Sequence, residues 1–176
     1  MQTNRRLRKF GSSFMSIQLL NRNSHFFSTR LPVELEIELN RIVGEGVTIN
    51  SDIEARLLEI KEGWSQCVDP YIALFKFYFR RGRYGEAESM VWQAMKLTSG
   101  RAGFDRNYRK LSPNAMDWLE NDSDQRHYLF CLKALGVIRL RRGKVAMAKR
   151  VLTKLEELDP YDEIGGLSYL QIAEGF

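Results

Sequence analysis

Cysteine and histidine are scarce in this 176-residue chain, and long apolar runs are absent. The two cysteines, Cys67 and Cys131, are too few for a disulfide framework or a four-thiolate zinc site, and their low number fits a reducing compartment. No run of about 18 apolar residues occurs, so the sequence predicts no transmembrane segment. The hydrophobic share of 44% and the charged share of 28% exclude a collagen-like or wholly disordered chain.

Acidic residues are missing from the first 33 positions. That segment holds six of the 27 Lys and Arg residues, which leaves 21 cations and all 22 anions to residues 34–176. The net charge of +5 and the pI of about 9.3 therefore arise from the N-terminal segment, while the body is close to neutral. A nucleic-acid-binding domain needs a basic surface on its folded part, so we expect no nucleic acid as partner of the body.

Residues 1–30 form a basic segment that is either disordered or a targeting sequence. Leu7, Phe10, Phe14 and Ile17 recur at helical spacing among Arg and Ser residues. This pattern is typical of an organelle transit peptide, and also of an anchor to an anionic membrane surface. Two further interpretations are a disordered tail and a true start at Met15. We expect a cytoplasmic protein, with a mitochondrial location as the alternative if residues 1–30 are a transit peptide.

Helix signals begin near residue 31, and no set of strands is indicated. The fold class expected for residues 31–176 is all-α, built of antiparallel helix hairpins joined by tight turns. Ser51 or Asn50, Asp69 and Asp124 are the expected caps. Residues 99–124 are expected to form an irregular insertion with one short helix beginning at 112–113. Apolar spacing together with Gly and Pro positions predicts the main helices at about 31–43, 53–64, 71–79, 84–97, 125–142, 144–158 and 162–173.

Two segments of the body, 69–87 and 130–148, are alike when aligned on Gly82 and Gly143. Both contain the turn Arg-Arg-Gly followed by Arg or Lys. An Ala lies five residues after each glycine, and an apolar residue lies four residues further on. These paired positions are Ala87 and Ala148, then Val91 and Leu152.

The two units resemble the tetratricopeptide repeat (TPR) family. The resemblance implies helix hairpins stacked as a short solenoid with a C-terminal capping helix, whereas a generic helical hairpin bundle is the alternative. The two glycines are 61 residues apart instead of about 34, so the array should be irregular. The matching residues are Tyr71, Leu74, Tyr78, Gly82, Ala87, Val91 and Ala94, then Leu132, Leu135, Gly136, Gly143, Ala148, Leu152 and Pro160. The departures are Phe75, Arg139 and Leu155.

A narrower resemblance covers residues 65–175, carried by 128–143 and 152–166. These segments are similar to small TPR-type proteins encoded with bacterial nitrogenase genes and, less closely, to helical-repeat components of bacterial type III secretion. The resemblance implies an accessory or assembly factor of nitrogenase whose partner is a nitrogenase component. The alternatives are a type III secretion component or chaperone, and an organelle-targeted helical-repeat RNA-binding protein that only the cationic start supports.

Signals for catalysis are close to absent. The sequence contains no Gly-rich phosphate loop, dinucleotide-binding fingerprint, His-Glu-x-x-His or Cys-x-x-Cys, so we expect a non-enzymatic protein without a cofactor. His127 and Cys131 share one helical face, but zinc needs at least three protein ligands. We expect a surface or capping role for His127 and a core position for Cys131. Capping rather than calcium binding is expected of Asp122, Asp124, Asp159, Asp162 and Glu163.

A protein-binding groove is the remaining candidate site. In TPR-like pairs the first helix of each unit lines the concave face, and here that face would carry four cations and one acid. This mixture of apolar and cationic side chains suits an amphipathic helix or an extended segment with carboxylates. The competing interpretation is that arginines favour helix C-termini and that the aromatic residues are core. The predicted partner-binding residues are Ile72, Lys76, Phe79, Arg80, Lys133, Val137, Leu140 and Arg141, with Asp69 and Phe130 beside them; no metal ligands are predicted.

Overall fold

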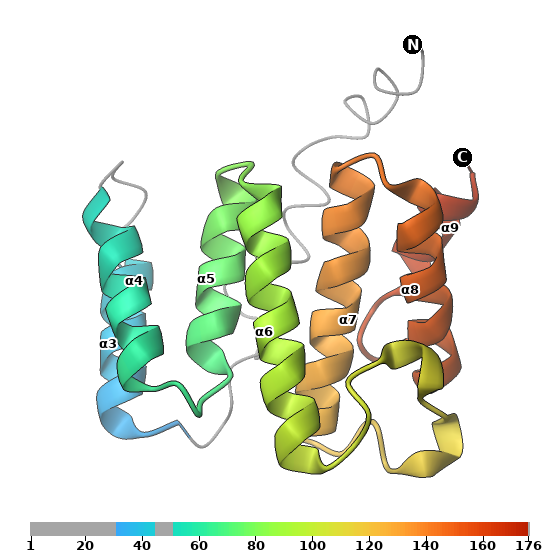
Figure 1. The fold of residues 1–176 in the computed structure, drawn as a ribbon, viewed down its shortest axis with the longest axis horizontal. Coiled ribbons are helices and arrows are strands. Elements are labelled where there is room, and N and C mark those ends of the chain that lie inside the picture. Colours follow the sequence, from blue (N-terminus) through green and yellow to red (C-terminus); the bar gives the residue numbers. More distant parts are fainter. Residues whose placement is uncertain (1–30, 45–50, 176) are drawn as a thin grey trace.

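The computed structural model describes residues 31–44 and 51–175, and within them every regular element is a helix (Figure 1). The all-α class is therefore confirmed for the described residues. The α-helices are α3 (Val33–Gly44), α4 (Ser51–Gly63), α5 (Asp69–Arg80), α6 (Tyr84–Ala102), α7 (Asp124–Arg141), α8 (Val145–Leu158) and α9 (Leu167–Glu174). Two short 3-10 helices, η1 (Tyr108–Lys110) and η2 (Pro113–Ala115), lie between α6 and α7. The interpretations of residues 1–30 and the Asn50 cap fall outside the described residues.

Each helix packs against the next one along the chain. Figure 1 shows α5, α6, α7 and α8 running alternately up and down side by side, with α3 and α4 at one end of the row and α9 at the other. The hairpins also touch through their first helices, because the rings of Phe75 in α5 and Phe130 in α7 lie 5.8 Å apart. The core therefore runs along the whole row.

The centre of the row is α7, which is buried around its whole circumference. All residues from 127 to 140 are buried, including the charged Lys133 and Arg139. A helix without a polar face has this environment when neighbours cover it on several sides. Its approach to α8 is close at Gly136, where an added Cβ would lie 2.6 Å from the side chain of Leu152. Gly136, one of the residues that match the repeat, therefore lies where α7 and α8 approach each other closely.

The two glycine turns predicted from the repeat have the same backbone geometry. Gly82 lies in the turn after α5 with φ of 72°, and Gly143 lies in the turn after α7 with φ of 73°. Both values are in the left-handed region, which glycine adopts without strain. Arg83 N–H donates to the Tyr78 carbonyl at 2.9 Å, and Lys144 N–H donates to the Arg139 carbonyl at 2.8 Å. Both predicted turns are confirmed, and the structure adds this hydrogen bond, which the two turns share.

The expected caps of α5 and α7 are wrong by one residue. The N-cap of α7 is Ser123, whose hydroxyl accepts from the Arg126 N–H at 3.1 Å, and Asp124 lies in the first turn. The N-cap of α5 is Val68, which makes no side-chain cap hydrogen bond. Asp69 is the first helical residue of α5 and is buried.

Two helix boundaries also differ from prediction. The helix expected over 84–97 continues to Ala102 and ends at Gly103, which is left-handed with φ of 76°, so the irregular insertion is 103–123. The last helix begins at residue 167 instead of 162. The preceding loop is held by Asp159, whose carboxylate accepts from the N–H groups of residues 163 and 164, and by Asp162, which accepts from those of 166 and 167. Asp159 and Asp162 therefore accept hydrogen bonds from backbone N–H groups, which is the chemistry expected of capping residues.

The insertion 103–123 is anchored by aromatic rings. Phe104 packs edge-on against Trp118 at 5.1 Å and against Tyr128 of α7 at 4.9 Å. The indole N–H of Trp118 donates to the Ser112 carbonyl at 2.9 Å. Of the short helix expected here, only the single turn η2 forms, because the buried indole fixes the chain in an open loop after it.

Candidate functional site

The side of α5 and α7 predicted to bind a partner, from Ile72 to Arg80 and from Phe130 to Arg141, is here called the α5–α7 face. Its cationic groups gather around two rings. The Nζ of Lys76 is 5.7 Å from the ring centroid of Phe130, and the Nζ of Lys133 is 5.3 Å from the same centroid. The Arg141 guanidinium is 5.9 Å from the ring centroid of Phe79. Cations from two different hairpins therefore meet on aromatic rings at the distances of cation–π contacts.

The predicted residues of this face differ in their accessibility. Arg80 is exposed, and Lys76 and Arg141 are half-buried. The other predicted residues are buried, so only these three cations are accessible to solvent. The buried members are Ile72, Phe79, Lys133, Val137 and Leu140, together with the neighbouring Asp69 and Phe130.

Burial shapes the electrostatics of the two lysines. Burial, together with the nearby Arg80 and against the attraction of Asp69, lowers the pKa of Lys76 to about 8. Burial likewise lowers the pKa of Lys133 to about 8, against the attraction of Asp162, while Lys76 repels it. The ammonium group of Lys133 donates to the Ile164 carbonyl at 2.5 Å, which ties α7 to the loop before α9. An anionic group placed beside these lysines would favour their charged forms.

The candidate metal and nucleophile positions have structural roles. His127 is buried, so a surface position is wrong; its Nδ1 lies 2.7 Å from the carbonyl of Ser123, the residue whose hydroxyl caps α7. Cys131 is in the core as predicted, and burial raises the pKa of its thiol to about 12. Among residues 31–44 and 51–175, His, Cys, Asp and Glu side chains form no cluster of three or more that could hold a metal ion.

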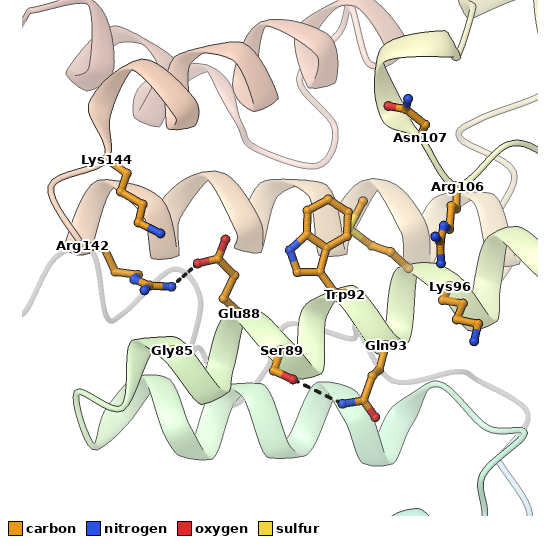
Figure 2. A pocket seen from close by; sticks show the side chains of 11 residues that line it. Gly85, Glu88, Ser89, Trp92, Gln93, Lys96, Arg106, Asn107, Arg142 and Lys144 are labelled. Carbon is orange, nitrogen blue, oxygen red and sulfur yellow. Dashed lines mark hydrogen bonds and ion pairs between the residues drawn. The ribbon is translucent and has the colours of Figure 1, made fainter.

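A second candidate site, which sequence reasoning did not find, is a pocket of about 860 Å³ beside α6 (Figure 2). Three separate segments form it: the outer face of α6, residues 106–107 of the insertion, and the turn between α7 and α8. Trp92 lies near the middle of the pocket and is 37% exposed. The lining residues are Gly85, Glu88, Ser89, Trp92, Gln93, Met95, Lys96, Arg106, Asn107, Arg142 and Lys144.

An ion-pair network fixes one end of this pocket. Glu88 of α6 is buried and accepts from Arg139 Nε at 3.1 Å, and its other oxygen pairs with Arg142. The Arg139 guanidinium is 5.7 Å from the Trp92 ring centroid. The network therefore joins α6 to α7 and to the following turn. It also holds the planar guanidinium of Arg139 against the Trp92 indole.

The sequence contained one signal for this pocket. Trp92 is a large aromatic residue between Val91 and Ala94, which both match the repeat, and the repeat pattern gives the Trp92 ring no role. The rest of the lining comes from residues 106–107 and 142–144, whose position against α6 depends on how the insertion folds.

Comparison with known protein families, with characterised proteins and with solved structures gives no match for this chain. None of the helices in the described part of the chain has the length and apolarity needed to cross a membrane. The geometry of the two sites is therefore the basis for a functional proposal.

Proposed function

We propose that this protein is a non-catalytic protein-binding module that presents the α5–α7 face to a partner. The observation that carries the proposal is the gathering of Lys76, Lys133 and Arg141 around two aromatic rings contributed by separate hairpins. Such a surface suits a partner segment that brings carboxylates to the accessible cations Lys76, Arg80 and Arg141.

The proposed scaffold is a short, irregular TPR-like solenoid with α9 as its capping helix. Support comes from the chain-order packing, from the matching turns at Gly82 and Gly143, and from the contact of Gly136 with Leu152. In an array of this kind, the first helices of successive hairpins line one surface. The contact between Phe75 and Phe130 is consistent with that arrangement.

The resemblance to small proteins encoded with nitrogenase genes supplies the specific form of the proposal. In that form the protein is an accessory or assembly factor, and the partner is a nitrogenase component. The half-buried Lys76 limits the chemistry of the partner, because a carboxylate beside it would stabilise its charged form. The partner surface should therefore carry Asp or Glu.

The test is affinity capture from the native organism, followed by reconstitution with the purified partner. Arg80→Glu and Lys76→Glu reverse accessible charges on the face, whereas Lys133 is too buried for charge reversal without loss of fold. Arg150→Glu, an exposed residue of α8, makes the same charge change elsewhere. We expect the first two variants to weaken partner binding at least about tenfold and the control to leave it unchanged. Binding that survives both variants, with thermal unfolding showing them folded, would show that the α5–α7 face is not the binding surface.

A further inference from the structure

The α6 pocket carries an excess of positive charge that its own acid does not balance. Glu88 is already engaged by Arg139 and Arg142. Of the remaining cations in the lining, Lys96 and Lys144 form no ion pair within the described part of the chain. Arg106 has Asp105 next to it in the sequence, and the Asp105 carboxylate is held by Lys110 at 3.1 Å. The pocket can therefore accept further negative charge.

The arrangement of the charges gives the ligand a shape. Figure 2 shows Lys96, Arg106 and Asn107 at one end of the pocket, Arg142 and Lys144 at the other, and Trp92 between them. A ligand that satisfies all three parts has acidic groups on both sides of an apolar or aromatic group. An indole exposed at 37% in the middle offers that group a flat surface for stacking.

We propose that this pocket is a second binding site, which takes a short acidic peptide segment with an aromatic or long aliphatic side chain stacked on Trp92. Arg106 and Lys144 bind carboxylates on the two sides of the stacked residue. Arg139, which is outside the lining, acts behind the indole as a positioning residue, because its guanidinium lies against the Trp92 ring and is held there by Glu88.

Charge over the whole body favours a peptide over a single-stranded nucleic acid. Residues 34–176 hold 21 cations and 22 anions, whereas nucleic-acid interfaces are strongly positive over a wide area. The pocket offers one indole, while proteins that bind single strands stack successive bases on several aromatic residues. The excess of cations here is local and matches a local acidic segment.

The experiment uses the full chain and a fluorescein-labelled peptide, Glu-Asp-Glu-Phe-Glu-Asp-Glu, in a fluorescence anisotropy titration. We expect a Kd below about 1 mM, and Trp92→Ala, Arg106→Glu and Lys144→Glu should each weaken binding at least about fivefold. Arg109→Glu changes an exposed arginine close to Arg106 but outside the lining, and should change the Kd by less than about twofold.

Matched probes separate the alternatives. A peptide with Gln and Asn in place of Glu and Asp should bind at least about tenfold more weakly, and a peptide with Ala in place of Phe should also lose affinity. Equal binding of the neutral peptide, no binding of the acidic one, or equal effects of Arg106→Glu and Arg109→Glu would overturn the proposal. Tighter binding of an oligothymidine that Trp92→Ala abolishes would assign the pocket to single-stranded nucleic acid instead.

This inference does not depend on the proposed function. Arg80→Glu on the α5–α7 face should leave peptide binding at the α6 pocket unchanged, and Trp92→Ala should leave capture by the α5–α7 face unchanged. If Arg80→Glu removes peptide binding as well, the peptide sits on the α5–α7 face and the pocket proposal is wrong.

Discussion

Gly136 shows how a single position sets the distance between two helices. A Cβ at this site would lie 2.6 Å from Cγ and Cδ2 of Leu152, so Gly136→Ala must displace a buried leucine or separate α7 from α8. We expect a loss of about 1–3 kcal/mol in the free energy of unfolding, measured by urea denaturation. Gly100→Ala in α6 is the matched control, because its Cβ would meet nothing within 4 Å. That variant should gain about 0.4–1 kcal/mol, and a similar loss in both variants would show that overpacking is not the cause.

Lys76 provides a residue-scale prediction on pH. Its pKa is about 8 in the folded protein and about 10.4 in an unfolded chain, so between pH 8 and 10 the unfolded state binds more protons. The free energy of unfolding should therefore rise with pH over this window, by about 2 kcal/mol from Lys76. Cys131 acts in the opposite direction above pH 9, because burial raises its pKa to about 12.

The measurement is accordingly a difference between wild type and Lys76→Met from pH 7 to 10. Cys131 is present in both proteins, so its effect cancels. The free energy of unfolding of wild type minus that of Lys76→Met should increase as pH rises through 8. A difference that stays constant over the window would mean that Lys76 titrates like an exposed lysine.

Residue-scale prediction from the sequence succeeded where one side chain has one possible role. The turn glycines Gly82 and Gly143 were assigned correctly, since a left-handed turn residue is favoured as glycine. The accessibility of the α5–α7 residues was not predictable. Helical spacing predicts which residues share one face of a helix, but it does not predict how far neighbouring helices bury that face. Val137 and Leu140 follow the predicted spacing and are nevertheless buried on all sides.

At the scale of the element, the insertion 103–123 depends on its aromatic anchor more than on helix propensity. Trp118 is buried, packs on Phe104 and donates to Ser112. We expect Trp118→Ala to cost about 3–5 kcal/mol if the insertion remains part of the cooperative core. Hydrogen exchange should show the loss of protection concentrated at residues 104–119, with α3 and α4 least affected. Uniform loss along the chain would indicate that the anchor supports the whole fold instead.

Helices were predictable from apolar spacing, while several of their ends were not. The last helix begins five residues later than expected because Asp159 and Asp162 satisfy backbone N–H groups through their side chains. Local side chain to backbone bonds of this kind compete with the helix, and their geometry depends on the burial of Asp159. The Ser123 cap is a smaller case, since Ser and Asp are equally good candidates at adjacent positions.

At the scale of the whole molecule, the α6 pocket could not be predicted from the sequence. Its lining joins residues 85–96 to 106–107 and 142–144, and only the folded insertion brings the second segment over α6. Short connections predict that successive helices pack against each other. The contacts of a long insertion cannot be predicted in this way, because no periodic pattern in the sequence indicates them. The same junction also carries the ion pairs that join α6 to α7.

The Glu88 network should therefore stabilise the whole row of helices. Glu88→Ala leaves Arg139, which is 6% exposed, without its carboxylate, and loss of one partner of a buried pair costs about 3–5 kcal/mol. The exposed pair of Lys149 and Glu174 at 3.6 Å is the control, and Glu174→Ala should cost less than about 1 kcal/mol. Glu88→Met combined with Arg139→Met should recover most of the loss in urea denaturation, since it removes both buried charges. If the double variant is no more stable than Glu88→Ala, the loss comes from packing at the α6–α7 junction and not from an unpaired charge.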